Sequence, residues 1–362
     1  MASQNNLTAV FTDIANAIRD KKGSVDTIKP INMADEILTI SSGGSVKDFI
    51  TTRNAQFLFY NCNSLTSEQL ASILKYDDTS GATNMKYMFS NCSTLTTIPL
   101  IDTSKATNMY YMFYGCSTLT TIPLLDTHNV ENMSYMFQQC SNLTSIPQLD
   151  TSSCTNMSYM FQQCSNLTSI SQLDTSSCTD MSYMFCKCIK LTSIPQLDTS
   201  KVTNMYCMFE ECGSLTSIPQ LDTSKATNMS YMFGNCNYLT TIPQLDTSSC
   251  TNMSYMFFYC RRLEKIDITK FVGRTSYNNQ FATNCNSLKT LIIRTMNTIP
   301  TLNSSAFDGC YHFYGTTDAT YNPNGLKDGR IYVPDDKVES LKTATNWSVF
   351  ADIIKPLSEY VE

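Results

Sequence analysis

The stretch LTSIPQLDTSSCTNMSYMFQQCS, residues 143–165, decides the fold because the chain repeats it with small changes. Its Met-Phe pair recurs at a constant step, since 112 − 88 and 136 − 112 both give 24 residues. The pair begins at Met88, Met112, Met136, Met160, Met184, Met208, Met232 and Met256. A fixed period of roughly 20 to 50 residues is typical of a solenoid, in which each unit buries its apolar side by stacking on its neighbours. The sequence therefore predicts an α/β solenoid with one long repeated body and small ends.

The chain of 362 residues carries few charges. Charged residues make up 15% of it, against about 25% in an average soluble protein. The net charge of −6 and the pI near 5.0 predict binding neither to nucleic acid nor to an anionic membrane. The N-terminus has no signal-peptide pattern, and no stretch reaches the ~20 apolar residues of a membrane helix. We therefore expect synthesis in the cytosol, no membrane insertion and no nucleic-acid partner.

Each repeat divides into a helical pattern and an extended pattern. Met109, Met112, Phe113 and Cys116 stand at i, i+3, i+4 and i+7, which predicts one core-facing stripe of a short helix. The residue before each stripe is Asn in most copies and is expected to cap the helix. These asparagines are Asn84, Asn108, Asn132, Asn156, Asn204, Asn228 and Asn252. A short strand with an apolar Leu and Ile follows, and the next residue is Pro in nearly every copy, so the parallel sheet should be narrow.

Most of the sixteen cysteines fall in one column of the repeat. The column comprises Cys92, Cys116, Cys140, Cys164, Cys188, Cys212, Cys236 and Cys260, with Cys62 and Cys310 in equivalent places outside the regular run. Free cysteine is among the most buried residue types. Metal ligands must converge from different directions, whereas a 24-residue column points every side chain the same way. We expect buried thiols and neither a metal site nor a cofactor.

The two ends of the chain predict separate modules. Residues 1–44 have two short amphipathic helical patterns followed by a Ser-Ser-Gly-Gly link, residues 45–315 hold the repeats, which are regular over about 78–260, and residues 316–362 should cap the last repeat. The apolar residues of the first module that should contact a partner are Leu7, Phe11, Ile14, Ile18, Ile31, Met33 and Ile37. The capping residues should be Ile331, Val333, Leu341, Trp347, Phe350 and Ile354. A strand is expected to end at Pro334, with a helix from about Asp335 and a second after Trp347.

Two parts of the chain resemble known families. The run LTAVFTDIANAIRDKKGSVDTIKPINMADEILTI resembles the short N-terminal module of tail, baseplate and other virion proteins of phages and prophages. Residues 55–310, with Phe-x-x-Cys-x-x-Leu-x-x-Ile-Pro and Thr-Asn-Met-x-Tyr-Met-Phe, resemble the BspA-like leucine-rich-repeat proteins of bacterial surfaces and phage virions. The first resemblance implies attachment to other virion proteins through residues 1–44. The second implies a right-handed solenoid with a role in adhesion or protein binding.

Three columns of the repeat are candidate surface ladders. The tyrosine column is Tyr87, Tyr111, Tyr135, Tyr159, Tyr183, Tyr231 and Tyr255, interrupted by Cys207, and its rings should point outward and stack. The aspartate column is Asp78, Asp102, Asp126, Asp150, Asp174, Asp198, Asp222 and Asp246; it predicts Asx turns rather than a calcium ladder. The polar column includes Thr144, Thr168, Gln148, Gln172 and Gln196, which suit sugar hydroxyls, a polar protein or solvent.

Catalysis is poorly supported by the sequence. His128 and His312 are the only histidines, and each is expected to be a solvated loop side chain. We therefore predict a non-enzymatic virion protein, a homo-oligomer such as a trimer, whose repeats bind a host cell-surface protein or glycan. The alternatives are an architectural role in capsid decoration or tail joining, and a bacterial surface adhesin of the BspA type.

Overall fold

The structure is a computed structural model that describes residues 55–74, 79–270 and 280–362. The chain divides into two compact units, Met1–Ser177 and Cys178–Glu362, and each is described here by itself. The predicted module of residues 1–44, with its seven contact residues, lies outside the described residues, as does Asp78. The predicted boundary between 315 and 316 stays a prediction.

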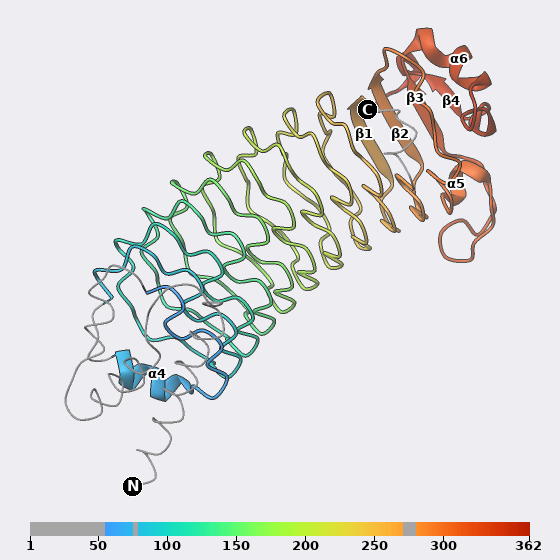
Figure 1. Cartoon of the computed structure of the whole chain (residues 1–362). Helices are drawn as coiled ribbons and strands as arrows, with labels where there is room; N and C mark the ends of the chain where they lie inside the picture. Colours follow the sequence, from blue (N-terminus) through green and yellow to red (C-terminus); the bar gives the residue numbers. More distant parts are fainter. Residues whose placement is uncertain (1–54, 75–78, 271–279) are drawn as a thin grey trace, which may run out of the picture. The chain divides into compact units, whose positions relative to one another are not determined.

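Both units are built from stacked coils, as the 24-residue period predicts (Figure 1). The phenylalanine of each coil lies parallel on the next: the ring centroids of Phe89 and Phe113 are 5.5 Å apart with an interplanar angle of 4°. In the second unit Phe209 and Phe233 repeat this arrangement at 5.7 Å and 5°. The Met, Phe, Cys and Leu columns around them are fully buried. Because identical side chains meet their own copies, one repeat sequence is enough to define the core.

The predicted helix of the regular repeat is wrong, and two tight turns take its place. In the coil of Met109, the N–H of Met112 donates to the Met109 carbonyl at 3.1 Å and that of Cys116 donates to the Phe113 carbonyl at 3.1 Å. The third residue of each turn has a positive φ, 58° at Tyr111 and 70° at Gly115. A positive φ at that position is the mark of a type II turn. Two such turns place residues i, i+3, i+4 and i+7 inside, as a helix would.

The turns make most of the backbone bonds between coils, and in the predicted strand segment 119–126 only the N–H of Thr120 donates to a neighbouring coil. The N–H groups of Tyr111 and Phe113 donate to the carbonyls of Ser134 and Met136 in the next coil, at 3.2 and 2.9 Å. Parallel bridges join Asn84, Asn108, Asn132 and Asn156 in the first unit, and Asp180, Asn204, Asn228 and Asn252 in the second. Each asparagine is an Asx turn rather than a helix cap: the Asn108 Oδ1 accepts from the N–H of Tyr110 at 3.1 Å. We call the segment from this asparagine to the column cysteine the turn edge.

Strands appear only after the regular run of the described repeats. The second unit has a parallel four-stranded sheet of order β1-β2-β3-β4 (Figure 1). Its strands are β1 (Lys265–Lys270), β2 (Thr290–Thr295), β3 (Arg330–Val333) and β4 (Ile354–Pro356). Asp267 of β1 stands at the repeat position of Pro243, since 243 + 24 = 267. The proline-bearing coil before it bonds to β1 through Leu245, whose N–H donates to the Asp267 carbonyl at 3.0 Å. Absence of proline is not sufficient for a strand, since the coil of Ser171 also lacks the proline and forms none.

Helices occur only outside the regular coils of the described chain. They are α4 (Ser67–Leu74), α5 (Tyr311–Tyr314), η1 (Asp335–Lys337), α6 (Val338–Thr343), η2 (Ser348–Phe350) and η3 (Leu357–Glu359). The helix α4, which the sequence analysis missed, begins with a capping box: the N–H of Thr66 donates to the Gln69 side chain at 2.9 Å, and the N–H of Gln69 donates to the Thr66 hydroxyl at 3.2 Å. None of the described helices is long and apolar enough to cross a membrane.

The C-terminal cap agrees with the sequence prediction. The strand β3 ends before Pro334, and helical structure begins at Asp335. All six predicted capping residues are at most 1% exposed. Phe350 packs its ring edge-on against Phe307 of the last repeat, at 5.6 Å between centroids. The strand β4 was not predicted; it pairs with β3 and extends the sheet by one strand.

All sixteen cysteines are free and buried, as predicted. In the column, each thiol donates to a phenylalanine carbonyl of the preceding coil; the Cys116 Sγ lies 3.0 Å from the Phe89 oxygen. Burial raises the pKa of Cys116 to about 12 and that of Cys154 to about 11. A thiol with a raised pKa is a poor nucleophile and a poor metal ligand at neutral pH. The column therefore serves packing and coil-to-coil bonding.

Candidate functional site

The tyrosine column forms the predicted ladder in both units. In the first unit the ring centroids of Tyr111 and Tyr135 are 4.3 Å apart at 11°, and those of Tyr135 and Tyr159 are 4.3 Å apart at 8°. In the second unit Tyr231 and Tyr255 stack at 4.5 Å and 8°. The rings are half-buried rather than fully outward. The reason for their direction differs from the prediction, because each tyrosine is the left-handed third residue of a turn and not an outward position on a helix.

The ladder begins one coil earlier than the sequence analysis placed it. Phe57 stacks on Tyr87 at 4.8 Å and 16°, in the degenerate first repeat. Tyr110 adds an edge-on contact to Tyr87 at 5.5 Å. Burial, followed by the proximity of Tyr110, raises the pKa of Tyr87 to about 12, and burial also raises the pKa of Tyr231 to about 12. The phenols are therefore neutral at physiological pH and offer hydroxyls and ring edges, not charge.

The predicted threonine and glutamine residues are exposed, and their polar groups also bond within the stack. Thr144 and Thr168 lie on the surface, and the Thr168 hydroxyl is 3.5 Å from the Thr144 carbonyl. The Gln148 amide donates to the carbonyl of Gln172 in the next coil at 2.5 Å and to that of Leu149 at 3.2 Å. Gln196 repeats this with Gln220 at 2.6 Å. These rows are structural as well as accessible. We call the segment that carries them, from the Leu before each Ile-Pro to the column Asp, the proline edge.

Each described column aspartate closes an Asx turn, as predicted. The Asp150 Oδ1 accepts from the N–H and the hydroxyl of Ser152, at 3.0 and 2.6 Å. Hydrogen bonds from Ser152 lower the pKa of Asp150, and those from Ser224 lower the pKa of Asp222. The sequence analysis missed the partner row of buried threonines that follow each aspartate. Most of their hydroxyls donate to the next coil, as from Thr127 to the Asp150 carbonyl at 2.7 Å, whereas the hydroxyls of Thr175 and Thr199 have no hydrogen-bond partner.

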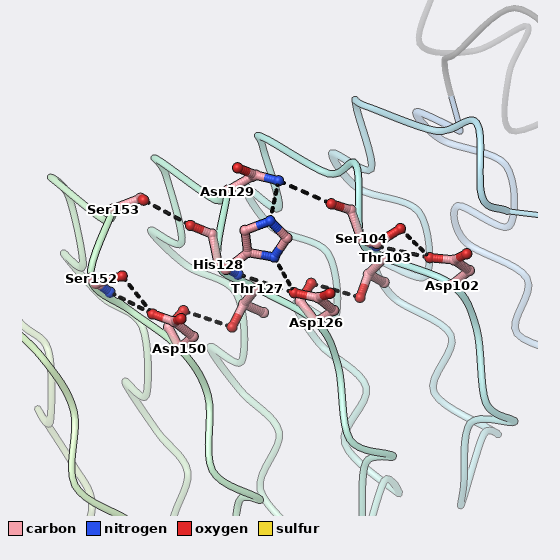
Figure 2. Close-up of polar contacts among 10 residues, drawn as sticks. All are labelled: Asp102, Thr103, Ser104, Asp126, Thr127, His128, Asn129, Asp150, Ser152 and Ser153. Carbon is pink, nitrogen blue, oxygen red and sulfur yellow. Dashed lines mark hydrogen bonds and ion pairs between the residues drawn. The ribbon is translucent and has the colours of Figure 1, made fainter.

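His128 departs from this pattern and organises a small polar network (Figure 2). It stands where neighbouring coils carry Ser104 and Ser152. Its Nδ1 lies 2.5 Å from the Asp126 Oδ1, and its Nε2 lies 2.6 Å from the amide nitrogen of Asn129. The hydrogen bond from His128 lowers the pKa of Asp126. A neutral imidazole protonated on Nδ1 satisfies both contacts, so neither ring nitrogen has a lone pair left to abstract a proton.

The second histidine corrects the prediction of a solvated side chain. The His312 ring is buried. Its Nδ1 lies 2.6 Å from the Asp328 carboxylate and its Nε2 lies 3.0 Å from the Tyr321 carbonyl. Both partners are acceptors, which ties α5 to the loop around Asp328. His312 is therefore a structural group of the C-terminal part.

The largest departure from the repeated surface is a pair of exposed leucines on the proline edge of the first unit. Leu100 is 78% exposed and Leu124 is 65% exposed. They border a hollow of about 850 Å³. Its lining is Leu100, Ile101, Asp102, Thr103, Ser104, Leu124, Leu125, Asp126, Thr127, Gln148 and Asp150. The sequence analysis missed this feature, although its signal is readable: Leu100 and Leu124 occupy the column that carries glutamine at 148, 172, 196, 220 and 244.

No group of three or more His, Cys, Asp or Glu residues in residues 55–74, 79–270 and 280–362 is arranged to hold a metal ion. The carboxylates of successive coils, such as Asp102, Asp126 and Asp150 in Figure 2, each turn to donors of their own loop. The described surface is thus one of polar rows, an aromatic ladder and one apolar hollow.

Comparison with known proteins identifies the repeat. The family model described as "Mycoplasma protein of unknown function, DUF285" matches residues 53–165, 116–218, 142–240 and 216–290. Together these matches span residues 53–290, which is 238 of 362 residues. The chain belongs to the DUF285 family. The match coincides with the stacked coils and supports a leucine-rich-repeat protein of the BspA-like kind.

The other comparisons add little to the DUF285 assignment. No curated protein matches the chain significantly. Among solved structures, the chain is similar to one titled "Crystal structure of TLR13-ssRNA13 complex", with 13% sequence identity and a TM-score of 0.29. That match covers 68% of this chain and 36% of the other.

Proposed function

We propose that this chain is a non-enzymatic binding protein whose repeats attach to a protein or glycan on a host cell surface. One observation carries the proposal: the regular coils bury their Met, Phe, Cys and Leu columns completely, and most of them leave the same uncharged threonine, glutamine and tyrosine groups accessible. Groups repeated in this way offer many identical weak contacts, and linked weak contacts add up to a strong attachment. The rows lack the cluster of perturbed, converging side chains that catalysis requires.

We further propose that the protein belongs to a phage virion, held to other virion proteins through residues 1–44, as a homo-oligomer such as a trimer. The resemblance of the N-terminal run to virion modules supports this placement. A cell-surface adhesin is the second candidate, and the family description, which names a Mycoplasma protein, favours it. Neither role needs a cofactor.

Fractionation of a producing culture distinguishes the two candidates. Purified particles should contain the protein by mass spectrometry, and labelled antibody should mark a fixed place on them in the electron microscope. Its absence from particles and presence in the cell envelope would replace the virion role with the adhesin role. Absence from both would contradict both placements.

Cell binding by the full chain tests the attachment itself. The protein should bind host cells at micromolar concentration and compete with infection. Tyr135→Ala combined with Tyr159→Ala should weaken binding, because it removes two neighbouring rings of the ladder. Tyr238→Ala is the matched control, since Tyr238 is 50% exposed and lies outside the column. Unchanged binding with lowered stability in the double variant would assign the ladder a purely stiffening role.

A further inference from the structure

The hollow beside Leu100 and Leu124 differs chemically from the rest of the proline edge. At this column, the glutamine amides fold over and donate to backbone carbonyls, as Gln148 does to Leu149 and Gln172. Leucine has no donor, so this column gives no such bond to the backbone carbonyls near Leu100 and Leu124. The two coils therefore present exposed apolar surface where the later coils present amides.

The hollow is also acidic. Asp102, Asp126 and Asp150 line it, and no lysine or arginine is among its lining residues. Hydrogen bonds from His128 and Ser152 favour the ionised forms of Asp126 and Asp150. Figure 2 shows the three carboxylates in a row from successive coils. Because the row has one sign of charge and lies next to the leucines, it complements a cation that accompanies an apolar group.

The size and lining of the hollow favour a peptide over a sugar. Its volume of about 850 Å³ falls in the range of roughly 300–1,000 Å³ that is typical of ligand sites. No aromatic residue lines it, so it offers no ring face for a sugar to stack on. The leucines, in contrast, suit an aliphatic side chain and the neighbouring carboxylates suit a cationic one, and a protein segment supplies both.

We propose that this hollow binds an extended protein segment in which a leucine-sized apolar side chain is flanked by lysine or arginine. The apolar side chain packs between Leu100 and Leu124, and the cation pairs with the row of Asp102, Asp126 and Asp150. The inference rests on the proposed binding function and names the partner chemistry for one part of the repeats. The tyrosine ladder takes no part in it.

Fluorescence anisotropy on the full chain tests the proposal with three labelled peptides. The probes are Gly-Lys-Leu-Arg-Leu-Gly, its acidic counterpart Gly-Glu-Leu-Glu-Leu-Gly and its polar counterpart Gly-Lys-Ser-Arg-Ser-Gly. We expect the first to bind, with weaker binding as sodium chloride rises, because paired surface charges are screened by salt. Binding of the acidic or polar peptide as tight as that of the first would overturn the proposal.

Variants locate the binding on the molecule. Leu100→Gln with Leu124→Gln introduces the residue that the later coils carry, so the fold is retained. This variant should bind the first peptide at least ~10-fold more weakly, because two apolar contacts are lost. Asp126→Asn with Asp150→Asn keeps a residue that can form the Asx turn. This variant should bind the first peptide more weakly, and its affinity should depend less on salt. Tyr238→Ala, which lies outside the hollow and outside the repeated polar rows, is the control and should leave the affinity unchanged. Equal losses in the control and the leucine variant would overturn the assignment to the hollow.

Competition with a panel of oligosaccharides tests whether the hollow binds a sugar instead of a protein segment. Displacement of the peptide by a sugar would overturn the choice of a protein segment. The cell-binding assay is read separately: if cells are not bound but the basic apolar peptide is, the host-attachment function fails while the hollow stands. If cells are bound and the peptide is not, the hollow fails while attachment stands.

Discussion

The two edges of a regular coil differ in how many backbone hydrogen bonds they make to neighbouring coils. On the turn edge, alternate backbone N–H groups donate to the next coil, as Phe113 does to Met136 at 2.9 Å, and the tyrosine rings stack there. On the proline edge of this coil, residues 119–126, only the N–H of Thr120 donates to a neighbouring coil, to the Thr96 carbonyl at 3.0 Å. The two edges vary at different positions: the turn edge varies most at the two residues before the column cysteine, whereas on the proline edge leucine replaces glutamine at Leu100 and Leu124. We conclude that stability is concentrated on the turn edge and that recognition can vary on the proline edge.

In the second unit, one coil without the proline forms the strand β1. In β1, Asp267 replaces the proline, the coil pairs with β2, and its carboxylate makes two bonds to Arg294, at 2.9 and 2.7 Å. The Asp267 side chain is 5% exposed. The coil of Asp267 thus bonds to its neighbours through a strand as well as through turns, whereas the coil of Ser171, which also lacks the proline, forms no strand.

The largest expected effect comes from returning this strand to the repeat pattern. Asp267→Pro leaves Arg294 without its nearly buried partner, and losing one member of such a pair costs about 3–5 kcal/mol. Thermal unfolding followed by circular dichroism measures the loss. Pro219→Ala, on a coil without the ladder, is the control and should cost less than about 1 kcal/mol. Equal losses of stability in the two variants would contradict the structural role assigned to Asp267.

The next effect is on the turn edge. Tyr135 has φ 61°, a conformation that costs a residue with a Cβ about 1–2 kcal/mol relative to glycine. Tyr135→Ala should lose its two stacking contacts, worth about 0.5–1.5 kcal/mol each. Tyr135→Gly loses the same contacts but relieves the backbone, so it should be about 1 kcal/mol more stable than the alanine variant. Denaturant unfolding of both variants checks this order; the reverse order would show that the turn is not left-handed at Tyr135.

A smaller effect is expected beside the proline edge. Thr127 is 1% exposed and its hydroxyl donates to the Asp150 carbonyl at 2.7 Å. Thr127→Val keeps the shape and removes the donor, which should cost about 1–2 kcal/mol. Thr127→Ser should retain most of the hydrogen bond to the Asp150 carbonyl and serves as the comparison. No loss in the valine variant would mean that solvent satisfies the carbonyl equally well.

The smallest effect is a pH dependence on the surface of the proline edge. The hydrogen bond from His128 lowers the pKa of Asp126 in the folded chain. A lowered carboxyl pKa stabilises the fold above the ordinary value of about 3.9 and is lost as the pH falls through the folded-state pKa. The melting temperature of wild type should therefore exceed that of His128→Ala at pH 6, and the gap should close toward pH 2. A gap that widens on acidification would contradict the assignment.

Much of the fold follows from the sequence because a column of identical residues needs only to stack on itself. The 24-residue step, the buried cysteines, the Asx turns and the capping residues from Ile331 to Ile354 were all predictable in this way. The turns were not, because two type II turns place Met109, Met112, Phe113 and Cys116 on the same side as a helix does. Glycine is the residue that usually indicates a positive φ in a sequence. Tyr111 has a positive φ without being glycine, so the sequence does not reveal the turn.

The candidate site was only partly predictable for a related reason. The rows of Tyr, Thr and Gln follow from the repeat and were predicted. The hollow depends on Leu100 and Leu124, which are informative only as exceptions to a glutamine column, and its depth depends on how neighbouring coils stack. The bonds of His128 to Asp126 and Asn129 likewise require the geometry of the loop.

Residue-resolved hydrogen exchange on the full chain tests most directly whether the turn edge holds the coils together. The amides of Met109, Tyr111 and Phe113, which donate to the next coil, should be strongly protected. The amides of residues 121–126 on the proline edge should exchange much faster, while those within β1 should be protected because the strand replaces the proline segment there. Strong protection on the proline edge together with rapid exchange at Tyr111 and Phe113 would contradict the account.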